Sequence, residues 1–218
     1  MLKQEAWQRN KYSRTSYFIT HISSSNMKLI IGLGNPGNNH TLTRHNAGFL
    51  CLDYLAKVWG MSPFELDKKM SGLVSTGLVG REKVLLVKPE PFMNASGTTV
   101  SQLVHFYKLE PTDIVVIHDD LDIAPSTYKL TNSSRAAGHN GVSDIIEKLG
   151  TQDFTRIRLG IGRPDHSPLH AGSETGTPTK TSCISSHDYV LQNFKEPELA
   201  ILSALFPTVK DELEKRLS

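Results

Sequence analysis

The sequence predicts a single α/β domain in which helices flank a twisted, mixed β-sheet. Apolar runs of strand length alternate with segments of helical periodicity along the chain. A chain of 218 residues suits one domain with a sizeable core. The composition is ordinary for a globular protein, and no apolar run is long enough to cross a bilayer. We expect this domain to occupy residues 27–218.

The first strand is expected at residues 28–33, and the first helix follows a polar stretch at about 46–59. Residues 73–79 and 83–87 alternate in polarity and predict a hairpin that turns at 80–82. The remaining elements, in chain order, are a helix from Asn94 (as its N-cap) to Tyr107, strands at 113–118 and 127–131, a helix at 142–149, a strand at 155–161, and two short helices divided at Pro207.

Residues 1–26 differ from the rest of the chain. They are basic, poor in acids and rich in serine towards their end. This composition resembles a mitochondrial presequence. It fits an unstructured extension without any targeting function equally well. We therefore expect an N-terminal extension and a mitochondrial location, with a cytoplasmic location as the alternative.

A second unusual segment spans residues 163–187, which are rich in Pro, Ser, Thr and Gly and lack apolar periodicity. Such a stretch predicts a long flexible loop that is either disordered or functional. The net charge of +2 permits contact with a polyanion without requiring it. Cys51 and Cys183 show neither metal-ligand nor disulfide spacing, which indicates a reducing compartment, and Cys51 is expected to be a buried small hydrophobe.

The pattern Gly32-x-Gly34-x-x-Gly37 after the first strand matches a dinucleotide-binding fingerprint, and Asp53 follows at about the right distance. Two features argue against a nucleotide site. Pro36 disfavours helical geometry before it, and the helical pattern resumes only near residue 46, so no helix N-terminus meets a phosphate. Asp53 also falls inside that helix rather than at the end of a second strand.

Polar side chains gather where predicted strands end or helices begin, namely Asn35, His45, Asn94, Asp119, His139 and Asn140. Taken singly, Asn35, Asn94, Asp119 and Asn140 are each better explained as a turn residue or a helix cap. Together they supply a histidine base, a carboxylate to orient it, and amides to hold a carbonyl. His139 has two interpretations, as part of the wall of the site or as a structural partner of the helix start, and the second is slightly favoured.

The sequence gives little support for hydrolysis by a serine nucleophile or by a metal-bound water. The nucleophile motif Gly-x-Ser-x-Gly is absent. The nearest metal-binding candidate, His118-Asp119-Asp120-Leu121-Asp122, has no second histidine cluster. A water activated by histidine and attacking an ester or activated carbonyl fits best, and we expect neither a metal nor another cofactor.

Six ordered motifs resemble those of the bacterial-type peptidyl-tRNA hydrolases, over about residues 27–194. They are Gly32-Leu-Gly-Asn-Pro-Gly37, Thr43-Arg-His-Asn-Ala-Gly48, Lys88-Pro-x-x-Phe-Met-Asn-x-Ser-Gly97, His118-Asp-Asp-Leu-Asp122, Gly138-His-Asn-Gly141 and Arg156-x-Arg-x-Gly-Ile-Gly162. The resemblance implies hydrolysis of the ester between a peptide and the 3′ ribose of tRNA, which recycles tRNA from aborted translation. It also implies that tRNA is the partner. Nothing in the sequence requires a dimer, so we expect a monomer, and we expect no membrane partner.

The resemblance also implies roles for individual residues. By similarity, His45 is the catalytic base and Asp119 orients it. Asn35 and Asn94 bind substrate near the scissile ester, with Asn35 distinguishing a blocked aminoacyl group from a free one. Asn140 contacts tRNA, and holds the water or polarises the carbonyl. The peptide-side groove is lined by Phe92 and Met93.

A basic surface for tRNA is expected on the strand at 155–161 and beside it. Arg156 and Arg158 lie two apart and share a face, so with Lys129 they could hold a phosphate. Arg135 could replace a basic residue that the family often has near Thr131. A solvated edge of the sheet explains these residues about equally well.

The chain departs from the family pattern in several places. His40 stands where the family usually has an aromatic residue, and Ser133-Ser-Arg-Ala-Ala137 replaces a glycine-rich run. The loop at 163–187 is longer than in the bacterial enzymes, and the chain after Phe194 is shorter. Two other functions stay open: an RNA-binding accessory factor that has lost hydrolysis, and a nicotinamide-dependent oxidoreductase that rests on the three glycines alone.

Overall fold

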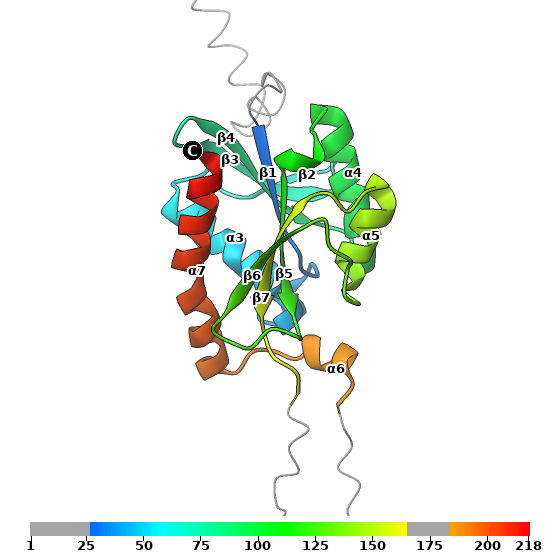
Figure 1. Cartoon of the computed structure of the whole chain (residues 1–218), viewed down its shortest axis with the longest axis vertical. Coiled ribbons are helices and arrows are strands. Elements are labelled where there is room, and N and C mark those ends of the chain that lie inside the picture. Colours follow the sequence, from blue (N-terminus) through cyan, green and yellow to red (C-terminus); the bar gives the residue numbers. More distant parts are fainter. Residues whose placement is uncertain (1–26, 165–183) are drawn as a thin grey trace, which may run out of the picture.

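The computed structural model describes residues 27–164 and 184–218, which form one layered α/β unit (Figure 1). A seven-stranded sheet lies at its centre with the strand order β2-β3-β4-β1-β5-β7-β6. The strands are β1 (Met27–Gly32), β2 (Glu65–Asp67), β3 (Gly72–Val79), β4 (Glu82–Pro89), β5 (Ile114–Asp120), β6 (Tyr128–Asn132) and β7 (Thr155–Gly160). The predicted fold class, a mixed sheet flanked by helices, is confirmed.

The middle of the sheet is parallel and both of its edges are antiparallel. Strand β1 runs parallel to β4 and to β5, and β5 runs parallel to β7. The antiparallel pairs are β2 with β3, β3 with β4, and β6 with β7. The carboxyl ends of the four parallel strands therefore meet at one end of the sheet, where an open α/β fold places its ligands.

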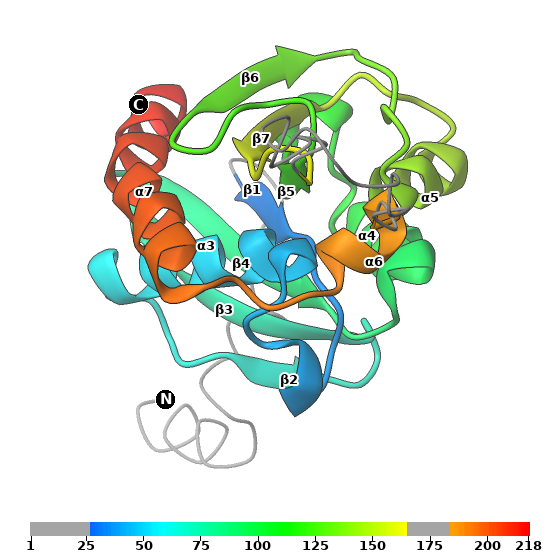
Figure 2. The same cartoon turned by 90° about the horizontal axis from the view of Figure 1, so that it is seen from below.

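Two helix pairs cover the two faces of the sheet (Figures 1 and 2). Helices α4 (Ser96–Tyr107) and α5 (Asn140–Leu149) bury one apolar cluster, which includes Leu29, Val116 and Val142. Helices α3 (Ala47–Val58) and α7 (Glu196–Leu217) bury the other, which includes Ile30 and Phe206. The short helix α6 (Ser186–Val190) lies near the carboxyl ends of the strands.

The glycines after β1 act mainly through close packing. A Cβ on Gly32 would lie 2.5 Å from the carbonyl oxygen of Gly48, and a Cβ on Gly34 would lie 2.6 Å from the ring of Phe49. Of these fingerprint glycines, only Gly37 has a positive φ, 97°. Helix α3 therefore packs closely against the end of β1. Only a single 3-10 turn, Asn38–His40, follows Gly37, and the first α-helix described begins at Ala47. Asp53 lies on α3, as expected.

Several expected elements need correction. The chain after residue 195 forms one helix, α7, which runs through Pro207. A proline inside a helix removes one backbone hydrogen bond, but buried side chains on both sides of it, from Leu202 to Leu217, anchor the helix against the sheet. Asn94 is not an N-cap, because the turn Met93–Ala95 precedes α4 and Ala95 takes the cap position without a side-chain bond.

Three further differences concern strands and loops. Strand β5 extends through Asp120, so Asp119 lies within the strand. The short edge strand β2 has no counterpart in the expected elements, since three residues carry too little periodicity to be recognised. The expected loop at 163–187 ends in helix α6, and its residues 165–183 lie outside the described residues, as does the extension at 1–26. Across the described segments, no helix is both long and apolar enough to cross a membrane.

Candidate active site

A hollow of about 730 Å³ opens at the carboxyl ends of β1 and β5. Its lining includes all seven side chains that the sequence proposed for catalysis and substrate binding: Asn35, His45, Phe92, Met93, Asn94, Asp119 and Asn140. They come from five separate segments of the chain, as the recurrence of polar residues at strand ends predicted. We refer to this hollow as the central hollow.

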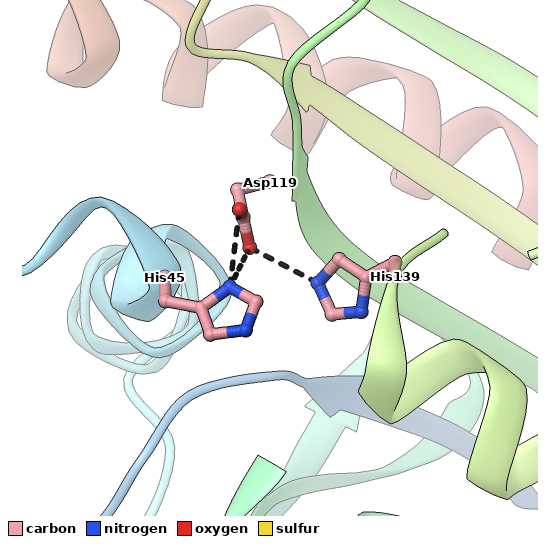
Figure 3. A group of neighbouring side chains, drawn as sticks. All are labelled: His45, Asp119 and His139. Atoms are coloured by element: carbon pink, nitrogen blue, oxygen red, sulfur yellow. Dashed lines mark hydrogen bonds and ion pairs between the residues drawn. The ribbon is translucent and has the colours of Figure 1, made fainter. Parts of the chain in front are cut away.

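His45 and Asp119 form a buried pair at the base of the central hollow (Figure 3). His45 lies in the 3-10 turn Arg44–Asn46, and its Nδ1 is 3.0 and 3.1 Å from the two carboxylate oxygens of Asp119. Nδ1 donates its proton to the carboxylate, so the lone pair of the imidazole lies on Nε2. Burial lowers the pKa of His45, but the charge and hydrogen bond of Asp119 outweigh burial and raise it above 6.5.

His139 binds the same carboxylate from the other side (Figure 3). Its Nε2 lies 3.1 Å from Asp119 Oδ1, and its Nδ1 accepts from the backbone N–H of Val142 at the start of α5. Because Nδ1 accepts, Nε2 carries the proton and donates it to Asp119. Both interpretations of His139 are therefore correct: it caps the helix and belongs to the wall of the site.

Asp119 is only 2% exposed and stays ionised at neutral pH. Burial alone would raise its pKa, but His45 and His139 hold the pKa well below the ordinary range. Behind it, His118 donates from Nδ1 to the backbone oxygen of Asp119 at 2.7 Å. Burial and the neighbouring His139 keep the pKa of His118 far below its ordinary value, so it adds no positive charge behind the site.

Asn35 is fixed at both its backbone and its side chain. The amide of Asn46 accepts from Asn35 N–H at 2.8 Å and donates to Asn35 O at 3.0 Å. The side-chain oxygen of Asn35 accepts from the backbone N–H of Met93 at 2.8 Å. Because the side-chain oxygen of Asn35 is already bonded to Met93, its NH₂ group is the part of the amide left to donate to a substrate in the central hollow.

The remaining predicted substrate residues differ in exposure. Phe92 is 61% exposed, and Met93 is buried below it. Asn94 and Asn140 are both exposed at the rim of the hollow, Asn94 in the turn before α4 and Asn140 as the first residue of α5. Their amide groups are thus open to a substrate, while Met93 forms part of the floor.

His45, Asp119 and His139 are also close enough to be considered as metal ligands, since one atom of each lies within 4.8 Å of the others. Their hydrogen bonds favour another interpretation. The lone pair of His139 Nδ1 is used by Val142 N–H, which leaves a protonated Nε2 facing the carboxylate. The Nδ1 of His45 likewise donates to Asp119. The donor set suits a hydrogen-bonded base better than a metal centre.

The four basic residues expected to contact tRNA separate into two kinds. Arg156 is 1% exposed, and its guanidinium binds the backbone oxygens of Ser134 and Arg135, so it holds the loop before α5 and is not open to a phosphate. This corrects the expectation for Arg156. Arg158 is half-buried and paired with Asp120 at 2.7 Å, although it does share a face with Arg156.

Lys129 and Arg135 are the two exposed members of this basic set. Lys129 lies opposite Arg158 in the β6–β7 ladder, and Arg135 follows β6 in the loop that leads to His139. Both therefore lie on the β6 side of the central hollow, and they remain candidates for contact with a polyanion.

Arg44 is a structural part of the site that sequence reasoning did not identify. It is 3% exposed and donates from Nη2 to both carboxylate oxygens of Glu198 at 2.9 and 2.7 Å. Its Nη1 donates to the backbone oxygens of Gln192 and Asn193, and its guanidinium lies 4.2 Å from the ring centre of Tyr189. The residue next to the candidate base therefore holds α6, whose Val190 lines the central hollow.

Comparison with known proteins identifies the family. The model of the family described as "Peptidyl-tRNA hydrolase" matches residues 29–218. The chain belongs to the peptidyl-tRNA hydrolase family. It is 43% identical over 179 residues to the peptidyl-tRNA hydrolase of Desulfitobacterium hafniense, covering 82% of this chain and 86% of that one. It is 42% identical over 189 residues to that of Bacillus anthracis, covering 87% and 88%.

Solved structures of the family have the same fold. The peptidyl-tRNA hydrolase of Acinetobacter baumannii superposes with a TM-score of 0.74 at 30% identity, covering 90% of each chain. A complex of a peptidyl-tRNA hydrolase with N-propanol gives a TM-score of 0.74 at 31% identity, also covering 90% of each chain. The curated relatives named above are bacterial, and they give no support to the mitochondrial address expected for residues 1–26.

Proposed function

We propose that this member of the peptidyl-tRNA hydrolase family cleaves the ester between a peptide and the 3′ ribose of tRNA, with His45 as the base that activates water. One observation carries the proposed mechanism. The His45 Nδ1 bond to Asp119 leaves the Nε2 lone pair at a hollow that is also lined by three asparagine amides. Family membership supports the substrate, and the bacterial relatives favour the cytoplasmic alternative.

The reaction begins when His45 Nε2 takes a proton from a water molecule as its oxygen attacks the ester carbonyl carbon. The charge of the resulting imidazolium is balanced by Asp119, which is already ionised and bonded to Nδ1. The tetrahedral intermediate then collapses, the carbonyl re-forms, and the bond to the 3′ oxygen breaks. The imidazolium returns its proton to that oxygen, which releases free tRNA and a peptide with a new carboxylate.

Amide groups bind the reacting ester. We propose that the NH₂ group of Asn35, whose oxygen is held by Met93 N–H, donates to the carbonyl of the blocked amino group. Asn94 and Asn140, which both line the rim, orient the ester and stabilise the developing oxyanion. Phe92 provides an exposed apolar surface for the side chain of the esterified residue.

The tRNA would approach from the side of β6 and α5. Lys129 and Arg135 are exposed there, and Arg158 lies beside Lys129 in the ladder. Contacts of this kind neutralise backbone phosphates and position the acceptor end without reading its sequence. We propose that the protein acts as a monomer and without a metal, because the base and its orienting carboxylate come from one chain and are complete by hydrogen bonding alone.

The experiment is a hydrolysis assay with purified protein, N-acetylaminoacyl-tRNA and the same tRNA with an unblocked aminoacyl group. We expect rapid release of free tRNA from the blocked substrate, slow release from the unblocked one, and no loss of rate in a chelator. A protein that binds both substrates and hydrolyses neither would be the RNA-binding accessory factor instead. A rate that a chelator abolishes and a divalent metal restores would contradict the mechanism.

A further inference from the structure

Asp144 joins helix α5 to the start of helix α4, beside the rim of the central hollow. The two helices lie side by side over one face of the sheet (Figures 1 and 2). Asp144 belongs to α5, and its Oδ2 accepts from the backbone N–H of Gly97, the second residue of α4, at 2.6 Å. Asp144 is not part of the lining of the central hollow, so its effect on the reaction has to pass through its neighbours.

This bond supplies a cap that α4 lacks in its own sequence. Ala95 occupies the N-cap position and makes no side-chain hydrogen bond there. The first N–H groups of a helix have no partner within the helix, and the helix dipole favours a carboxylate beside them. Asp144 therefore satisfies from α5 a donor that a Ser, Thr, Asp or Asn at the N-cap would otherwise bind. The start of α4 thus depends on a side chain of α5.

Two glycines allow the helix starts to approach each other this closely. A Cβ on Gly97 would overlap the carbonyl group of Asp144. A Cβ on Gly141, three residues earlier on α5, would lie 2.5 Å from Met93 Sδ and 3.2 Å from the Met93 carbonyl oxygen. The chain that enters α4 is therefore held against α5 at two points, Met93 with Gly141 and Gly97 with Asp144.

The two rim amides belong to the segments that these contacts join. Asn94 lies between Met93 and Gly97 in the chain, so both of its flanks are held against α5. Asn140 lies four residues before Asp144, on the same face of α5. The Gly97–Asp144 bond therefore helps to fix how far apart the amides of Asn94 and Asn140 lie.

We propose that Asp144 is a positioning residue, which sets the separation of Asn94 from Asn140 and so the geometry in which both amides meet the ester and its oxyanion. This inference rests on the proposed function, since it assumes that the two amides bind the reacting ester. Oxyanion stabilisation requires donors that are in place before the reaction begins. Loss of the Gly97–Asp144 bond should therefore lower kcat and leave KM nearly unchanged.

The test compares variants of Asp144 with N-acetylaminoacyl-tRNA as the substrate. Asp144→Asn keeps an oxygen that can accept from Gly97 N–H, whereas Asp144→Ala removes the acceptor. We expect Asp144→Ala to lose about tenfold in kcat, less than the loss of an oxyanion donor itself costs, and Asp144→Asn to keep most of the wild-type rate. If Asp144→Ala does not fold, Asp144→Glu takes its place, because it displaces the acceptor by one methylene.

A double variant shows whether Asp144 acts through the rim amide of Asn94. In an Asn94→Ala background the Asp144→Ala change should cost much less in kcat than in the wild type, because the group that it positions is already gone. A contribution to stability alone would give the same factor in both backgrounds. This equality would overturn the inference, and so would a wild-type kcat in Asp144→Ala.

Trp59→Phe is the matched control for the loss of a hydrogen bond between helices. Trp59 Nε1 donates to Glu214 Oε1 at 2.8 Å, which joins α3 to α7 away from the central hollow. The variant should lower the thermal unfolding temperature, as Asp144→Ala does, and leave kcat unchanged. Equal losses of kcat in the two variants would also overturn the inference. Failure of the proposed function looks different, because the wild-type protein would then not hydrolyse the substrate.

Discussion

His139 Nε2 lies 3.1 Å from Asp119 Oδ1, so His139 donates to the carboxylate that also holds His45. Two matched variants separate this donation from the helix cap that His139 makes at Val142. His139→Gln keeps an N–H donor that can reach Asp119 from the position of the histidine Nε2, but it loses the acceptor that caps Val142 N–H. His139→Asn keeps a capping acceptor and loses the donor. We expect the Asn variant to lose about tenfold in kcat and the Gln variant to lose less, by analogy with other orienting hydrogen bonds.

The measurement is kcat at saturating substrate together with thermal unfolding. If the Gln variant were the slower enzyme and also the less stable one, the contribution of His139 would be the cap alone. Equal rates in both variants and the wild type would show that His45 alone suffices to position the Asp119 carboxylate.

The pH dependence of the rate follows from the raised pKa of His45. A general base must be neutral, so kcat/KM should rise with pH and level off above an inflection that lies higher than 6.5. Asp119→Asn removes the charge that raises the pKa, and burial then lowers it. The inflection should therefore move to lower pH while the plateau falls. A plateau that falls without movement of the inflection would contradict the assigned pair.

The contacts of Arg44 with Glu198 and with the backbone after α6 predict an effect on stability and on substrate binding. Arg44→Lys keeps the charge but cannot bind both oxygens of Glu198 and the backbone oxygens at once. We expect it to lower the free energy of unfolding by about 2 kcal/mol and to raise KM, because α6 lines the central hollow. Urea denaturation and steady-state kinetics measure the two effects. Arg216→Lys, at an exposed i,i+4 pair on α7, is the control and should change neither.

The basic residues predict a difference in salt dependence. Lys129→Ala should weaken tRNA binding and reduce the slope of log K against log salt by about one, as loss of one phosphate contact does. Lys57→Ala, at an exposed position on α3, should leave the slope unchanged. Arg156→Met should lower stability instead, because the Arg156 side chain binds the loop before α5. An unchanged slope for Lys129→Ala would remove it from the tRNA surface.

Much of the fold and of the site could be predicted from local patterns. Strand and helix periodicity placed most elements within a few residues, and asparagine and acid residues at strand ends anticipated the central hollow. Pro207 misled the prediction, because local propensity opposes a helix there and only packing against the sheet overrides it. Asn94 resembled an N-cap, but the chain inserts one 3-10 turn before α4.

The contacts that depend on distant segments could not be predicted. Arg156 looked like a surface cation because its partners are backbone oxygens more than twenty residues away, which leave no trace in composition. Arg44 meets Glu198 across about 150 residues, and the pairing needs the complete fold. A local signal did exist for Asn46, since Thr43 and Asn46 are three residues apart, as in a hydrogen-bonded turn, and Asn46 clamps Asn35.

The most direct test of the account is single-turnover hydrolysis of N-acetylaminoacyl-tRNA by the His45→Ala variant. Removal of a general base in a histidine–carboxylate pair should slow the chemical step by about a thousandfold or more, without changing thermal stability by more than a few degrees. His105→Ala, at an exposed histidine on α4 outside the central hollow, should match the wild type. A His45→Ala variant that is folded and hydrolyses the substrate at a near-normal rate would contradict the assignment of His45 as the base.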